Sequence, residues 1–233
     1  MSDFLSLDVV DKDGAIREAA EAAGVDRRDF LRKGALAGGG IVAGGAMFNG
    51  ILSPAQAAIS TKRPSKKNDV KILNFALTLE FLESAFYTQA AANNIAGSDP
   101  VLAKFVSTVK SHEAKHVTFL RQTLKSAAVK KPDFDFGNTV TDLATFKATS
   151  QVLEDTGVRA YSGQAGNISQ GPVVTAAATI LSVEARHASW IRFINGGGAA
   201  DAATSALPAP LTFDKPASEK AILKAVGATG FIK

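Results

Sequence analysis

Two short motifs constrain the fold of this chain more than any other feature of its sequence. Residues 110–120 read KSHEAKHVTFL and residues 181–191 read LSVEARHASWI, so each segment contains a glutamate followed three residues later by a histidine. Side chains at positions i and i+3 of an α-helix project from the same side. Apolar residues continue the same stripe in both segments, which predicts two helices that each turn a carboxylate and an imidazole inward. The pairs are Glu113 with His116, and Glu184 with His187.

The two motifs belong to an internal repeat. Glu80 precedes Tyr87 by seven residues, Glu154 precedes Tyr161 by the same interval, and the chain contains only 2 tyrosines. Each half of the repeat is therefore a segment with Glu and Tyr followed by a segment with Glu-x-x-His. Such a repeat predicts two similar helix pairs packed around one core.

Hydrophobic periodicity predicts an all-α domain with four long helices. The expected helices cover about 69–93, 98–128, 142–164 and 172–195, and the whole bundle covers 68–198. Asn68 is the expected N-cap of the first helix, and Asp99 followed by Pro100 is a typical start for the second. Residues 129–140 lack a helical period, and their reach of at most ~40 Å just allows them to cross a bundle ~36 Å long.

The segments outside the predicted bundle are a linker over 58–67 and a C-terminal tail over 199–233. We expect the tail to be irregular, with helix only near 218–226, and to pack on the bundle because its apolar content is too high for a free segment. Its apolar residues are Leu207, Leu211, Phe213, Leu223, Val226, Phe231 and Ile232.

Four glutamates in the middle of four packed helices require a compensating charge. An ionised carboxylate in a protein core is costly unless it is paired or bound to a cation, and four together repel one another. The sequence contains no cysteine, so carboxylates and imidazoles would have to hold any metal. The repeat therefore predicts two divalent metal ions.

This set of residues resembles the ferritin-like di-metal carboxylate family, whose four-helix bundle has a long connection between its second and third helices. The resemblance implies that Glu80 and Glu154 are terminal ligands, that Glu113 and Glu184 bridge two iron or manganese ions, and that His116 and His187 each bind one ion. The segment LNFALTLEFLESAFY over 73–87 and the FDKP at 213–216 resemble the branch that contains plant desiccation-related proteins and exported bacterial proteins.

Three alternatives concern residues beside these ligands. The sequence HEAKH over 112–116 also matches the zinc protease motif, although the second half of the repeat has Val183 in place of His112. Glu83 lies one turn from Glu80 and could face the same side. Tyr87 and Tyr161 could be core residues with bonded hydroxyls, or could support the metal ions or their redox chemistry. We expect Glu83, His112 and both tyrosines to lie around the ligands.

Residues 1–57 resemble a twin-arginine export signal. The segment from Arg27 to Arg32 reads RRDFLR, and a Gly- and Ala-rich apolar run and a PAQA sequence ending at Ala57 follow it. A membrane anchor is the alternative, but the many glycines of the run disfavour a stable helix. We therefore expect recognition by the twin-arginine export machinery and a periplasmic or extracellular protein.

The sequence supports two main classes of function, and iron storage in a large shell is a weaker third because a Pro-rich tail stands in place of the short fifth helix of cage ferritins. The first is oxidative-stress redox chemistry on peroxide or oxygen, of the catalase, peroxidase or ferroxidase type, at a di-iron or di-manganese site. The second is a non-catalytic stress or desiccation-related envelope protein. The ligand set does not separate iron from manganese. The formal charge of +4 is spread without basic and aromatic clusters, so nucleic acid is not an expected partner, while homo-oligomerisation stays open.

Overall fold

The computed structural model describes residues 58–61, 63–198 and 207–233. The predicted export signal over 1–57 lies outside the described residues. Among the residues that the structure describes, every helix is too short or too polar to span a membrane.

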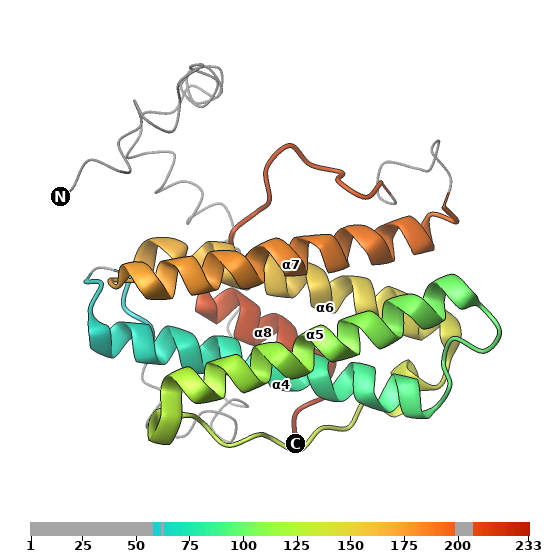
Figure 1. The fold of residues 1–233 in the computed structure, drawn as a ribbon, viewed down its shortest axis with the longest axis horizontal. Helices are drawn as coiled ribbons and strands as arrows, with labels where there is room; N and C mark the ends of the chain where they lie inside the picture. The colour runs from blue at the N-terminus through green and yellow to red at the C-terminus, as the bar shows by residue number, and fades with distance from the viewer. Residues whose placement is uncertain (1–57, 62, 199–206) are drawn as a thin grey trace. The chain divides into compact units, whose positions relative to one another are not determined.

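Four long helices form the body of the described region (Figure 1). They are α4 (Lys66–Ala92), α5 (Pro100–Leu124), α6 (Leu143–Gln164) and α7 (Gly171–Asn195). α4 packs chiefly against α5, and α6 packs chiefly against α7, so the chain forms two helix hairpins joined by a long crossover. The prediction of an all-α four-helix bundle with a long connection between its second and third helices is confirmed.

Capping residues fix where the two middle helices begin. The Asp99 carboxylate accepts hydrogen bonds from the backbone N–H groups of Val101 and Leu102, and Pro100 occupies the first turn of α5. Asp142 accepts one from Thr145 N at 2.8 Å and so caps α6. These bonds satisfy backbone donors that a helix start otherwise leaves unpaired.

The predicted N-cap of the first helix is wrong. Ser65, not Asn68, caps α4, and its hydroxyl accepts the Asn68 N–H at 3.1 Å. The Asn68 side chain instead accepts from Ser60 N at 2.7 Å and donates to the carbonyl of Asn167 at 3.1 Å. It therefore ties the segment before the helix to the turn between α6 and α7.

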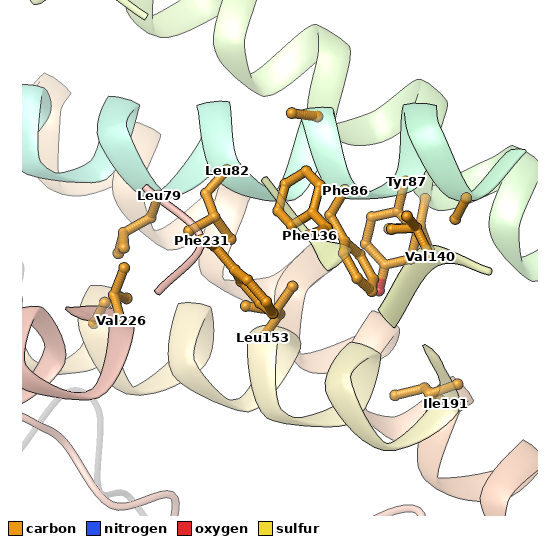
Figure 2. Packing of buried hydrophobic residues seen from close by; sticks show 14 of the residues in the cluster. Leu79, Leu82, Phe86, Tyr87, Phe136, Val140, Leu153, Ile191, Val226 and Phe231 are labelled. Carbon is orange, nitrogen blue, oxygen red and sulfur yellow. The ribbon is translucent and has the colours of Figure 1, made fainter. Parts of the chain in front are cut away.

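The crossover and the C-terminal segment hold each other on the bundle. Phe134 pairs with Ile232 in an antiparallel bridge, and Asp135 N donates to Phe231 O at 2.8 Å. The crossover ends in a short 3-10 helix, η2 (Gly137–Val140). The helix expected near 218–226 is present in the tail as α8 (Glu219–Thr229), and its Val226 faces Leu79 of α4 in Figure 2.

The tail packs on the bundle only in part. Ile222, Val226 and Phe231 are buried, but Leu211 and Phe213 are 50% and 64% exposed, so the expectation that these two cover the bundle is wrong. The tail backbone reaches α6 at Gly163, where a Cβ atom would lie 1.9 Å from the carbonyl oxygen of Ala217. Glycine is required there because a side chain would displace the tail.

Aromatic rings fill the end of the bundle where α4 and α7 finish. Phe86 stacks on Phe146 with ring centroids 5.3 Å apart and meets Phe136 edge-on at 5.4 Å. Figure 2 shows Phe86, Tyr87 and Phe136 gathered beside Val140. All of these side chains are at most 4% exposed, so this end of the bundle is solidly packed.

A buried carboxylate links α4 to the start of α7, and it gives a testable prediction. Asp69, 1% exposed, accepts hydrogen bonds from Ser169 N and Oγ, both at 2.8 Å, and from Gln170 N at 3.1 Å and Nε2 at 2.9 Å. Burial alone would raise the pKa of Asp69, but these bonds outweigh it and lower the pKa. Asp69→Asn should therefore cost about 1–3 kcal/mol in the free energy of unfolding at pH 7.

The pH dependence of that cost follows from the sign of the shift. A lowered pKa stabilises the fold fully above the unfolded pKa of about 3.9. This stabilisation disappears as the pH falls through the lower pKa of the folded state. Urea unfolding between pH 7 and pH 3 should show the difference between wild type and Asp69→Asn shrinking only at the acidic end, with exposed Asp214→Asn as control. A difference independent of pH would contradict this account.

Candidate metal centre

The structure brings all six predicted ligands together in the middle of the bundle. α4 contributes Glu80, α5 contributes Glu113 and His116, α6 contributes Glu154, and α7 contributes Glu184 and His187. The four glutamates are 0% exposed and His187 is 2% exposed. Each carboxylate comes from near the middle of a long helix, so all four are level in the bundle.

These side chains form two overlapping groups, which we call site 1 and site 2. Within each group, ligand atoms from every residue lie within 4.8 Å of one another. Glu113 and Glu184 belong to both groups. The members of site 1 are Glu80, Glu113, His116 and Glu184, and those of site 2 are Glu113, Glu154, Glu184 and His187.

Both histidines turn the Nδ1 atom toward the carboxylates. His116 Nδ1 lies 3.2 Å from Glu80 Oε2 and 3.1 Å from Glu184 Oε1. His187 Nδ1 lies 3.1 Å from Glu113 Oε1 and 3.2 Å from Glu154 Oε2. The two imidazoles therefore occupy matching positions, one in each site.

The donor atoms of the cluster fit divalent cations. Among the described residues, the buried side-chain atoms without a hydrogen-bond partner include Glu113 Oε1, Glu154 Oε2, both oxygens of Glu184 and His187 Nδ1. His187 Nδ1 is close to two carboxylates but lacks the angles of a hydrogen bond. Unsatisfied buried polar atoms are rare in native proteins, and here they converge as oxygen and nitrogen ligands suited to iron or manganese.

The electrostatics of the cluster point the same way. Burial raises the pKa of Glu113 and of Glu184 well above the usual range, and neighbouring carboxylates add to both shifts. Burial would lower the pKa of His116, but its close contacts with the carboxylates of Glu113, Glu184 and Glu80 raise it to about 12. The cluster thus favours added positive charge, which two divalent ions would supply in place of protons.

Each of the two tyrosines forms a hydrogen bond with a glutamate of another helix. Tyr87 of α4 donates its hydroxyl hydrogen to Glu154 of α6, and lies 2.5 Å from Ser150 Oγ. Tyr161 of α6 donates to Glu80 Oε1 of α4 at 2.5 Å. Tyr87 therefore orients Glu154, and Tyr161 orients Glu80, each in the other half of the repeat.

His112 lies outside both sites but contacts one of them. Its Nδ1 is 2.8 Å from His187 Nε2, and the two rings stack with centroids 5.1 Å apart. The second nitrogen of His187 is thus engaged while Nδ1 faces the carboxylates, an arrangement that fixes the orientation of metal-binding imidazoles. The zinc protease interpretation of HEAKH is not supported, since His112 and His116 do not join in one group of ligand atoms.

Glu83 is a fifth buried carboxylate beside the cluster. It is 3% exposed, and burial together with the charges of Glu184 and Glu154 raises its pKa well above the usual range. A Cβ atom on Gly157 would lie 3.2 Å from Glu184 Oε2 and 3.5 Å from Glu83 Oε1. Glu80, not Glu83, shares a group of ligand atoms with Glu113.

Sequence reasoning missed Gly157 and Ser150. Gly157 follows Glu154 by three residues, as Glu83 follows Glu80, so the repeat itself carries the signal. The first half has the Glu83 carboxylate at this position, and the second half has Gly157, which has no side chain. The missing side chain leaves room for Glu83. Ser150 gave no comparable signal because its role depends on a tyrosine from another helix.

Comparison with known proteins agrees with this geometry. A search among curated proteins finds no match to the sequence. The family model for the ferritin-like domain matches residues 68–197, which is more than half of the chain and covers the four long helices apart from the first two residues of α4. The chain therefore belongs to the ferritin-like domain family, and its buried Glu and His cluster is compatible with a di-metal site.

Proposed function

We propose that the cluster binds two iron or manganese ions and that the protein carries out redox chemistry on dioxygen or peroxide. The observation that carries this proposal is the overlap of sites 1 and 2 through Glu113 and Glu184. Shared carboxylates hold two ions as a pair, which can exchange two electrons with one oxidant. A single ion that only stabilised the fold would need the ligands of site 1 or of site 2, but not both.

The bound pair would supply two electrons, each ion passing from the divalent to the trivalent state. Two electrons and two protons convert dioxygen to hydrogen peroxide, or convert hydrogen peroxide to two water molecules. For turnover, either a second hydrogen peroxide, oxidised to dioxygen with release of two protons, or an external reductant would return the two electrons. The protein's own residues hold the carboxylates in place, exclude bulk water and supply hydrogen bonds at fixed positions.

Several residues have defined parts in this arrangement. Tyr87 and Tyr161 keep one oxygen of each terminal glutamate occupied and so leave the other oxygen to face the sites. His112 holds the ring of His187. His112 is half-buried, and the side chain of His116 is 12% exposed, so protons can reach the cluster from the side where these imidazoles lie.

The test is to load the protein anaerobically with either iron or manganese and then to measure turnover of peroxide and of dioxygen. Manganese-loaded protein should disproportionate peroxide without a reductant, and iron-loaded protein should consume oxygen or act as a reductant-dependent peroxidase. Glu184→Ala should abolish the activity while the helical circular dichroism persists. If metal-replete protein turns over neither oxidant and Glu184→Ala loses only thermal stability, a structural role in stress protection is the better account.

We also propose that the protein is exported by the twin-arginine route, on the strength of the RRDFLR sequence alone. This route carries folded proteins, which suits a chain that should select its metal before it meets tighter-binding copper or zinc. Arg27→Lys combined with Arg28→Lys should leave the precursor in the cytoplasm, as measured by cell fractionation and immunoblotting. Unchanged export of the double variant would contradict the proposal.

A further inference from the structure

An apolar cavity lies in the bundle at the end where α4 and α7 begin, the left end in Figure 1. Side chains from all four long helices line it. Its volume of about 20 Å³ exceeds the ~10–15 Å³ that one water-sized molecule needs. Two polar side chains in its wall are engaged elsewhere, since Tyr161 donates to Glu80 and Gln164 accepts from Asn167 Nδ2 at 2.9 Å.

The cavity lies about one helical turn from site 1. Three of its lining residues each lie four positions, or one helical turn, from a member of site 1. The fourth helix contributes the ring of Tyr161, whose hydroxyl contacts Glu80. The three pairs are Ala76 with Glu80, Leu120 with His116, and Ile180 with Glu184.

The opposite end of the cluster is closed. Tyr87, the repeat equivalent of Tyr161, is 0% exposed and packs against Phe86, Phe105 and Phe146. Tyr161 retains 8% exposure and lines the cavity. The two sites thus differ in one physical respect, because the cavity lies beside site 1 whereas packed aromatic rings lie on the side of site 2.

We propose that this cavity is a binding site for dioxygen that supplies site 1, an inference that rests on the proposed redox function. The lining offers water almost no hydrogen-bonding partners, and apolar cavities in proteins take up small apolar molecules such as xenon. Dioxygen has the same character. Hydrogen peroxide would lose its hydrogen bonds to water on entering, at a cost that the apolar lining does not offset. Peroxide would instead approach from the side where His112 and His116 are partly exposed.

The test fills the cavity without touching the ligands. Ala177 lines the cavity, and Ala178 is exposed on the next position of α7, so Ala177→Leu and Ala178→Leu form a matched pair. Ala176→Leu, also at the wall, is a second variant should the first fold poorly. Xenon-pressurised crystals of metal-free protein should show xenon in the cavity of wild type and Ala178→Leu, but not of Ala177→Leu.

The second readout is the rate of iron oxidation. In protein loaded with two ferrous ions, Ala177→Leu should slow oxidation by dioxygen about tenfold and leave oxidation by peroxide within about twofold of wild type. Both rates should be unchanged in Ala178→Leu.

Three outcomes would overturn the inference. Wild-type crystals without xenon would show that the cavity does not take up apolar molecules. A variant that excludes xenon but keeps the dioxygen rate, or loses both rates equally, would show that the cavity does not select the oxidant. If loaded wild type reacts with neither oxidant, the proposed function itself fails, and the role of the cavity fails with it even where xenon binds.

Discussion

Replacing Glu184 or Glu113 with alanine should abolish the binding of both metal ions. Each of these carboxylates belongs to site 1 and to site 2, so its loss removes a ligand from both groups. Glu80→Ala and His116→Ala should instead weaken site 1 more than site 2, because these residues belong to site 1 alone. Metal analysis of protein loaded anaerobically and then desalted should give about two ions per chain for wild type and none for the bridging variants.

Glu219 provides the control for this series. It lies in α8, belongs to neither site, and accepts a hydrogen bond from Ile59 N at 2.9 Å. Glu219→Ala should retain two ions. The account would be wrong if Glu184→Ala kept one ion at wild-type affinity, because a shared carboxylate cannot be lost from only one site.

Removing the metals should lower the free energy of unfolding of wild type substantially. It should also reverse the effect of Glu184→Gln on that free energy, from destabilising to stabilising. A ligand at 100 times its dissociation constant stabilises a protein by about 2.7 kcal/mol, so two filled sites contribute about 5 kcal/mol. Glu184→Gln should lose this contribution. In metal-free protein, however, Glu184→Gln should be more stable than wild type by about 1–3 kcal/mol, because both oxygens of Glu184 are buried without hydrogen-bond partners.

The reversal arises from the neighbours of Glu184. A neutral amide removes one of the crowded carboxylates and can donate hydrogen bonds to those that remain. Urea unfolding with and without chelator measures both effects, with Glu219→Gln as the matched control. Equal stability of wild type with and without metal, or a less stable metal-free Glu184→Gln, would contradict this account.

The fold could be predicted because two independent patterns coincide. The helical period gave the four long helices, and the repeated Glu and His positions required their middles to face one another. The start of α4 was wrong because Ser65 and Asn68 are both good capping residues, and the choice depends on contacts that Asn68 makes with Ser60 and Asn167. Such contacts between distant segments leave no local signal.

The inner part of the candidate site was easier to predict than its surroundings. Glutamate spacing could place Glu80 and Glu154 on helix faces, but it could not show that Tyr161 serves Glu80 and Tyr87 serves Glu154. This pairing of each tyrosine with the glutamate of the other helix depends on how α4 is rotated about its axis relative to α6. The cavity beside site 1 could not be predicted from the sequence either. Small and large apolar residues give the same helical periodicity, whether or not their side chains fill the space between the helices.

The measurement that tests the central claim most directly is anomalous diffraction from a crystal loaded with iron or manganese. We predict two metal peaks about 3.5–4 Å apart. One should lie among Glu80, Glu113, His116 and Glu184, and the other among Glu113, Glu154, Glu184 and His187. A single peak, or no peak within this cluster in metal-replete crystals, would contradict the account of a shared two-metal centre.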